Sequence, residues 1–174
     1  CANILKIAAE VADNRFVSWR GRTANPRQAF EALSVCEAFS QLAGIELLST
    51  LHGSGADREA LAQQAAAAGV PPTANDDWSD IFAKVLTALI EPYLGINRPT
   101  ILHDYPSVEA ALARPKADDP RLAERFELYL CGVELANGFG ELTDAREQRR
   151  RFNLEMAKKQ SRYGERYPID EDFL

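Results

Sequence analysis

The chain has 174 residues, of which 46% are hydrophobic and 26% charged, so its composition is that of a globular protein with one or two domains. A net charge of −6 argues against a nucleic-acid coat protein or a polybasic membrane binder, because both need a basic surface. The three cysteines, at positions 1, 36 and 131, form no disulfide framework and no CxxC pair, and a chain with only two histidines is not expected to hold a zinc site. No apolar run approaches the roughly 20 residues of a membrane span, so we expect a reduced cytoplasmic protein without a membrane partner.

Residues 1–98 are expected to be mainly helical, because their apolar side chains recur at helical spacing. Asn25 and Pro26 form a helix-start signal, in which a capping residue precedes proline at the first helical position. Gly44 and Gly69 mark the positions at which two of the predicted helices end. The predicted elements are a helix over residues 2–13, a short strand over 15–19, and helices over 26–44, 57–69 and 76–91.

Residues 99–174 predict strands as well as helices. Apolar and polar side chains alternate on both sides of a tight turn at Cys131-Gly132, which indicates a hairpin. Asp144 and Glu147 match a capping box at the start of a helix. The predicted elements are a strand over residues 100–103, a helical turn over 108–113, two strands between 125 and 141, and a helix over 145–162. We therefore expect an α+β fold, in which an antiparallel hairpin or sheet is flanked by helices.

The predicted hairpin carries the residues best suited to chemistry. Asn137, Phe139 and Glu141 are spaced two apart, so they share one face of a strand. An amide, an aromatic ring and a carboxylate together suit a ligand with a primary ammonium group. Glu127 and Glu134 flank the turn, and two nearby carboxylates suit Mg²⁺ bound to a nucleotide. An edge hairpin with solvated acidic side chains is the simpler alternative.

Three stretches of this hairpin resemble the segment before motif 3 in class II lysyl-tRNA synthetases: Arg125-Phe-Glu, the run from Gly132 to Phe139, and Glu141-Leu-Thr-Asp. The resemblance covers most of residues 99–174, and covers the helical half only loosely. It implies a partial class II aminoacyl-tRNA synthetase catalytic domain, with residues 1–98 as its mainly helical part and 99–174 as part of its core.

Within that family, the chain is most similar to the short paralogues that attach lysine to elongation factor P. The tRNA enzymes usually have a glycine where Ala136 stands and an asparagine where Thr143 stands. The run Tyr167-Pro-Ile-Asp also resembles the short paralogues. The resemblance thus implies lysine or β-lysine as substrate and elongation factor P as acceptor, with tRNA-Lys as the alternative acceptor.

The resemblance also implies a role for six residues and two cofactors, ATP and Mg²⁺. Glu127 and Glu134 match the acids that hold Mg²⁺ and ATP, and Leu135 matches a position whose backbone lies against the nucleotide. Asn137 and Phe139, together with Glu141, match the set that recognises lysine. No catalytic residue of the family falls within this chain.

Motifs 1, 2 and 3 of the family are not recognisable in the chain, which begins at Cys1 rather than methionine. We therefore expect a fragment of about half of a catalytic domain that is inactive by itself, from a parent protein that forms a homodimer. Two fragments are possible, one of an elongation factor P lysyltransferase and one of a true lysyl-tRNA synthetase. A non-catalytic helical interaction module that retains a synthetase-like hairpin is the third possibility.

Strand geometry adds one structural prediction. With a two-residue turn at Cys131-Gly132, regular pairing places Glu127 opposite Ala136. Alternation then sends Asn137 and its neighbours to the other face of the sheet. A single pocket requires both sets on one face, so we predict a bulge or kink between residues 135 and 138.

Overall fold

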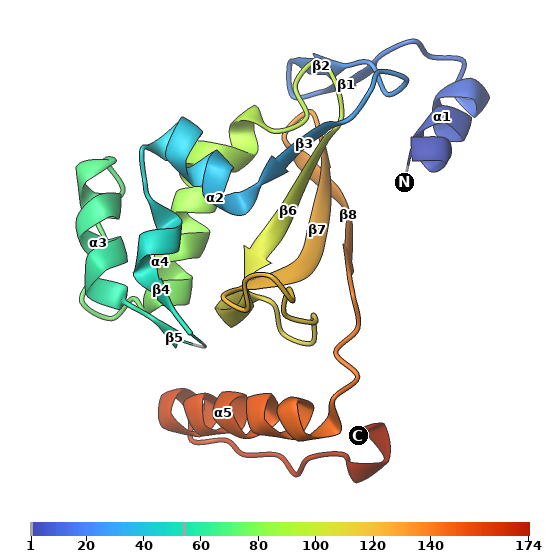
Figure 1. Cartoon of the computed structure of the whole chain (residues 1–174). Coiled ribbons are helices and arrows are strands. Elements are labelled where there is room, and N and C mark those ends of the chain that lie inside the picture. The colour runs from blue at the N-terminus through green and yellow to red at the C-terminus, as the bar shows by residue number, and fades with distance from the viewer. Residues whose placement is uncertain (1, 54) are drawn as a thin grey trace.

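A four-stranded mixed sheet lies at the centre of the fold, and helices pack on one of its faces (Figure 1). The computed structural model describes residues 2–53 and 55–174. The predicted α+β class is confirmed for this part of the chain. None of its helices combines the length and the apolar character needed to cross a membrane.

The strands of the sheet come from both halves of the sequence. They are β3 (Glu31–Ser34), β6 (Thr100–Pro106), β7 (Leu122–Leu130) and β8 (Val133–Phe139). Their order in space is β3-β6-β7-β8, with β3 parallel to β6 and the other pairs antiparallel. Strand β8 therefore forms one edge of the sheet.

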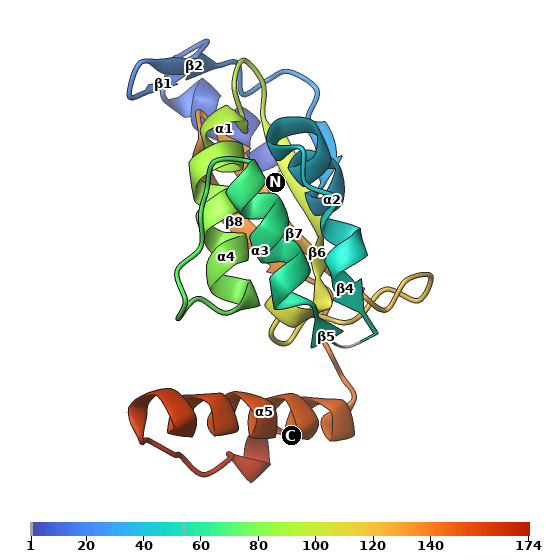
Figure 2. The ribbon, with the colours of Figure 1, turned by 90° about the vertical axis from the view of Figure 1, so that its left-hand side faces the viewer.

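Helices from the first half cover one face of this sheet, and Figure 2 shows α3 and α4 in front of it. The α-helices are α2 (Val35–Ala38), α3 (Arg58–Ala67) and α4 (Trp78–Val85), and the 3₁₀ and π segments are η1 (Phe39–Ala43), η2 (Leu47–Thr50), η3 (Leu86–Ile90) and η4 (Glu91–Tyr93). Leu102, Tyr105 and Tyr129 of the sheet pack into the same buried apolar cluster as these helices. The main core therefore joins both halves of the chain.

Stacked aromatic side chains form the centre of this core. The ring of Phe82 lies 5.0 Å from that of Phe39 and 5.4 Å from that of Trp78. The indole N–H of Trp78 donates to the hydroxyl oxygen of Thr50 at 3.1 Å. A buried polar group needs such a partner, so this hydrogen bond makes the position suitable for tryptophan.

Capping side chains set the starts of the helices. Asp57 accepts from the backbone N–H of Ala60 and begins α3, which confirms the predicted helix there. Asp77 and Asp80 form a reciprocal capping box at the start of α4. The predicted helix over residues 76–91 exists, but its last turns are the π segment η3 and the 3₁₀ segment η4.

The predicted helix over residues 26–44 is wrong in its first part. Residues 31–34 form β3 because they pair with residues 100–103 of β6, a long-range contact that local spacing does not reveal. Glu31 is held there by Arg98 Nη2 at 2.7 Å and by the Thr100 hydroxyl at 2.9 Å. The helical segment begins only at Val35, where Ser34 and Glu37 form a capping box.

The remaining elements of the first half are a helix and two short hairpins. They are α1 (Ala2–Val11), the hairpin of β1 (Val17–Trp19) and β2 (Arg22–Ala24), and the hairpin of β4 (Leu51–His52) and β5 (Gly55–Ala56). The predicted helix over 2–13 and the predicted short strand over 15–19 are thus confirmed, with shorter bounds.

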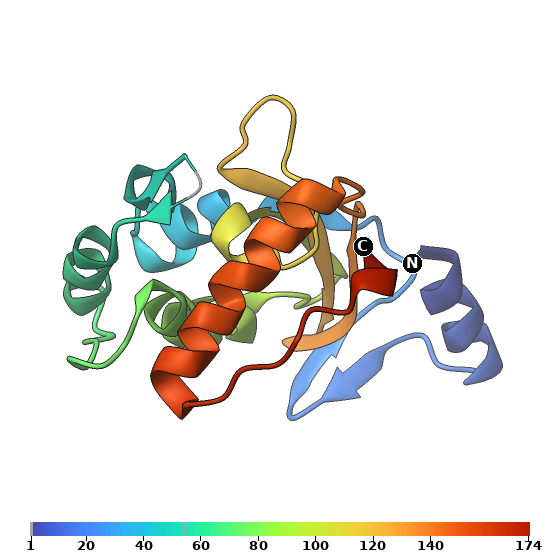
Figure 3. The ribbon, with the colours of Figure 1, turned by 90° about the horizontal axis from the view of Figure 1, so that it is seen from below.

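After β8 the chain continues into α5 (Ala145–Tyr163) and the short η6 (Glu171–Phe173), which confirms the predicted helix over 145–162. Asp144 caps α5, but Glu147 pairs with Arg150 and Arg151 instead of completing a capping box. Figure 3 shows α5 crossing beneath the sheet and the helices. In place of the predicted helical turn over 108–113 there is a 3₁₀ turn, η5 (Ser107–Glu109).

Polar contacts attach α5 to the rest of the chain, and none of its residues is buried. Arg162 Nη2 lies 2.7 Å from Asp77 and 3.0 Å from Asp80 at the start of α4. Arg151 Nη1 donates to the backbone carbonyl oxygens of Ala111 at 2.6 Å and Ala113 at 3.0 Å.

Candidate functional site

The hairpin of β7 and β8 contains the predicted irregularity, at Leu135. Tyr129 lies opposite Glu134, whereas Leu128 lies opposite Ala136, so Leu135 is an extra residue on β8. This β-bulge lies at the start of the segment in which a bulge or kink is predicted. It leaves Leu135 outside the regular pairing with β7.

The bulge brings both predicted sets of residues to one face of the sheet. The predicted pairing of Glu127 with Ala136 is wrong, because the extra residue shifts each later pair, and Glu127 lies opposite Asn137. Phe139 lies opposite Arg125, which shares its face of β7 with Glu127. Glu127, Asn137 and Phe139 therefore lie on one face, as a single pocket requires.

Glu134 lies toward one end of this face, and Glu141 lies beyond the end of β8. Glu134 is opposite Tyr129, which is next to Glu127 on the same face of β7. Glu141 follows the end of β8 and forms a single bridge with Ala113. Glu127 is 5% exposed. The other predicted site residues are exposed, namely Glu134, Leu135, Asn137, Phe139 and Glu141.

Glu127 is the buried centre of a hydrogen-bond network. Its Oε1 accepts from Arg125 Nη2 at 2.7 Å, and its Oε2 accepts from the Tyr129 hydroxyl at 2.6 Å. A buried carboxylate is tolerated when it is paired and hydrogen-bonded in this way. Burial, together with the adjacent Glu127 carboxylate, raises the pKa of both Tyr129 and Tyr105. Both phenols therefore stay protonated at physiological pH.

Two further carboxylates add negative charge beside Glu127. Burial and the charge of Glu127 raise the pKa of Glu91, at the start of η4. Desolvation and the charge of Glu127 also raise the pKa of Glu134, and the nearby Arg125 opposes this rise. Mutual repulsion of this kind is relieved by a bound cation.

The donor set fits Mg²⁺ on a nucleotide better than a metal held by protein alone. In the two described stretches, 2–53 and 55–174, no group of three or more His, Cys, Asp or Glu side chains is arranged to hold a metal ion. Mg²⁺ in phosphate-binding sites needs only one or two carboxylates, because phosphate and water oxygens complete its shell. Glu127 and Glu134 can supply these two, since each carboxylate oxygen of Glu127 retains a second lone pair.

Replacing Glu91 by glutamine should stabilise the chain at neutral pH. The raised pKa means that folding favours the protonated form of Glu91. Its contribution to stability is therefore fully present below the pKa of the unfolded state. That contribution is lost as the pH rises through the pKa of the folded state. Glutamine carries no such penalty. Urea unfolding should therefore show a larger gain over wild type at about pH 8 than at about pH 4.

Glu147→Gln is the matched control of opposite sign. Hydrogen bonds from Arg150 and Arg151 lower the pKa of Glu147 to about 2. The Glu147 carboxylate therefore stabilises the fold at pH values above its pKa in the unfolded state. This stabilisation is lost as the pH falls through its pKa in the folded state. Glutamine here should lower stability at neutral pH. A loss of stability in Glu91→Gln at about pH 8 would contradict the assigned electrostatics.

Three residues near Glu127 were not assigned to the site from the sequence, namely Arg125, Tyr129 and Glu91. Arg125 and Tyr129 alternate with Glu127 along β7, and this spacing of two was a signal that could have found them. Glu91 could not be found in this way, because it reaches the site from the helical half through tertiary packing.

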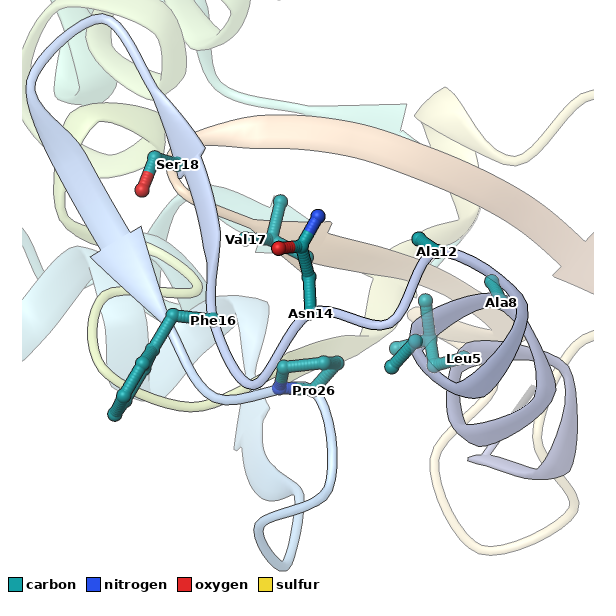
Figure 4. A pocket seen from close by; sticks show the side chains of 9 residues that line it. Leu5, Ala8, Ala12, Asn14, Phe16, Val17, Ser18 and Pro26 are labelled. Carbon is teal, nitrogen blue, oxygen red and sulfur yellow. The ribbon is translucent and has the colours of Figure 1, made fainter.

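A separate pocket lies between α1 and β1, in a part of the sequence that is distant from the site residues (Figure 4). It has a volume of about 360 Å³, and Leu5, Phe16 and Val17 are among its lining residues. No side chain that lines it is ionisable. This pocket therefore lacks the groups for acid–base or phosphate chemistry, and the β7–β8 face remains the better candidate site.

Comparison with known proteins places the chain in a family. The family described as tRNA synthetases class II (D, K and N) matches residues 3–169. An elongation factor P–(R)-β-lysine ligase from Klebsiella pneumoniae (strain 342) is 40% identical over 149 residues, which are 84% of this chain and 44% of that protein.

Ligases of the same name from two Salmonella strains match over the same shares of each chain. They are 39% identical in Salmonella arizonae and 38% identical in Salmonella paratyphi B. The match thus covers less than half the length of these curated relatives. With the matched region extending over nearly all of the sequence, this chain belongs to the class II tRNA synthetases (D, K and N).

Proposed function

We propose that this chain forms part of an enzyme that activates lysine or β-lysine with ATP and transfers it to elongation factor P. The bulge at Leu135 supports this proposal, because it brings Asn137 and Phe139, proposed for the amino acid, to the same face as the acidic pair proposed for Mg²⁺. The names of the relatives, elongation factor P–(R)-β-lysine ligases, support the choice of acceptor and substrate.

The proposed reaction has two steps. A carboxylate oxygen of the amino acid attacks the α-phosphorus of ATP, and the bond to the bridging oxygen breaks, which gives an aminoacyl adenylate and pyrophosphate. A lysine amine of the acceptor then attacks the acyl carbon, AMP leaves, and the amine loses a proton as the amide forms. Positioning and charge stabilisation carry such reactions without a protein nucleophile.

The roles proposed for individual residues follow from their places on the face. Glu127 and Glu134 would hold Mg²⁺, which neutralises phosphate charge when it is bound. Leu135 offers a backbone released from regular pairing for contact with the nucleotide. Asn137 and Phe139, with the Glu141 carboxylate, would bind the amino acid through a hydrogen bond, a ring contact and an ion pair.

Unfolding of this chain by urea, with and without ligands, tests the proposal. Mg²⁺, ATP and lysine or β-lysine at 100 times their dissociation constants should each add about 2.7 kcal/mol to the free energy of unfolding. Glu141→Ala should abolish the gain from the amino acid and keep the gain from Mg²⁺ and ATP. Glu165→Ala, an exposed acid outside the site, is the control and should keep both gains.

Catalysis is tested in the gene product to which this chain belongs, by amino-acid-dependent exchange of pyrophosphate into ATP. Labelled lysine or β-lysine should then be transferred to elongation factor P and not to tRNA. Exchange with neither amino acid, or transfer to tRNA alone, would contradict the proposed function. The same gene product should sediment as a homodimer, as the family resemblance implies.

A further inference from the structure

The guanidinium of Arg125 is held from several elements at once. Its Nη2 donates to Glu127 at 2.7 Å, and its Nη1 donates to the backbone carbonyl oxygen of Glu109 in η5 at 2.6 Å. Its Nε lies 3.4 Å from Asn137 Oδ1 on β8. The guanidinium carbon lies 4.5 Å from the centre of the Tyr105 ring on β6. The side chain is 21% exposed.

Two of these contacts reach different halves of the proposed site. Glu127 belongs to the acidic pair proposed for Mg²⁺ and ATP, and Asn137 belongs to the set proposed for the amino acid. Arg125 is thus a single side chain that contacts a member of each set, because β7 and β8 are paired in the register that the Leu135 bulge creates.

The chemistry of the guanidinium determines how Asn137 is oriented. Arginine has only donors, so the amide must turn its oxygen toward Arg125. Its NH₂ group is then directed away from the guanidinium and is available to donate to an oxygen atom of a ligand. Without Arg125 the amide could present either its oxygen or its nitrogen, because both ends have nearly the same shape.

Resting on the proposed function, we infer that Arg125 is a positioning residue that holds Glu127 in place and fixes the amide of Asn137 with its NH₂ group presented to the amino-acid substrate. Arg125 acts through these two side chains and does not itself touch the substrate. Its planar fork is required, because a lysine ammonium is a compact group that cannot replace all three of these donors in their places.

The conservative variant Arg125→Lys separates the two roles. Lysine keeps a positive charge beside the buried Glu127 carboxylate, which avoids the large cost of leaving that charge unpaired. It loses the contact that orients Asn137. We expect the KM for the amino acid in pyrophosphate exchange to rise about tenfold, as for one lost hydrogen bond, with the KM for ATP changed less than about threefold.

Arg121→Lys is the matched control. Arg121 also donates twice to a carboxylate, through Nε at 2.9 Å and Nη2 at 2.7 Å to Asp119, but it lies outside the site. This variant should leave both KM values unchanged. In addition, Arg125→Lys combined with Asn137→Ala should be no worse than Asn137→Ala alone, because the amide that Arg125 orients is then absent.

Several results would overturn the inference. An equal rise in both KM values, or additive effects in the double variant, would mean that Arg125 only supports the fold. If the unmodified gene product shows no exchange at all, the proposed function fails instead, and the inference is tested in this chain by nitrogen-15 NMR. The Asn137 side-chain NH₂ signals should shift in Arg125→Lys and stay in place in Arg121→Lys, and unchanged signals in both would overturn it.

Discussion

Gly95→Ala is expected to lower the free energy of unfolding by about 4 kcal/mol, from left-handed strain and a backbone clash together. Gly95 has φ +70°, and a Cβ there would lie 2.5 Å from Leu130 Cα and 2.6 Å from the backbone of Tyr129. Backbone atoms of a paired strand cannot move aside cheaply. Urea unfolding followed by circular dichroism measures the loss.

Gly44→Ala separates the two contributions. Gly44 has a similar φ of +66°, but no atom lies within 4 Å of the position that its Cβ would occupy. Its loss should be about 1 to 2 kcal/mol, which is the cost of the left-handed conformation alone. Equal losses in the two variants would contradict the close approach at Gly95.

This approach matters for the site as well as for stability. The Gly95 carbonyl oxygen accepts from the N–H of Cys131, and the Leu94 carbonyl oxygen accepts from the N–H of Gly132, both at 2.8 Å. These bonds hold the turn that joins β7 to β8. A displaced turn would alter the register on which the shared face depends.

Removing the central ring of the aromatic stack, in Phe82→Ala, should cost about 3 to 5 kcal/mol. Phe82 is 3% exposed and stacks on two other rings, so its loss removes buried area and leaves a cavity that the rigid neighbours cannot fill. Thermal and urea unfolding should both report the change.

Phe152→Ala is the control for a peripheral aromatic pair. The Phe152 ring lies 5.9 Å from that of Phe173, which is 58% exposed. We expect a loss of about 1 kcal/mol, mostly from the pair itself. A loss as large as that of Phe82→Ala would mean that the C-terminal segment contributes to the core.

Local sequence signals predicted the elements whose ends are fixed locally. Asp57 and Asp77 cap helices that the sequence predicts. The Cys131-Gly132 turn lies between two stretches in which apolar and polar residues alternate. Strand β3 was not predictable in this way, because its residues lack a strand pattern and are held by pairing with β6. Because apolar residues recur at helical spacing in this region, the predicted helix over 26–44 wrongly included Glu31–Ser34.

The sequence could indicate only those candidate site residues that lie together in one continuous motif. The geometric need for a common face predicted a bulge, and the structure has one at Leu135. The positions of Arg125 and Tyr129 were visible in the alternation of β7, although their part in the network was not predicted. Glu91 comes from a separate region of the chain, and only the packed fold brings its carboxylate near Glu127.

The attachment of α5 has a consequence for the thermodynamics of this chain. No residue of α5 is fully buried, so this helix adds less to the heat capacity of unfolding than the apolar surface of the aromatic core does. Its ion pairs with Asp77 and Asp80 lie at the surface, where salt screens charges over about 8 Å at physiological ionic strength. We therefore expect rising salt to weaken the ion pairs between α5 and α4 more than it weakens the apolar core.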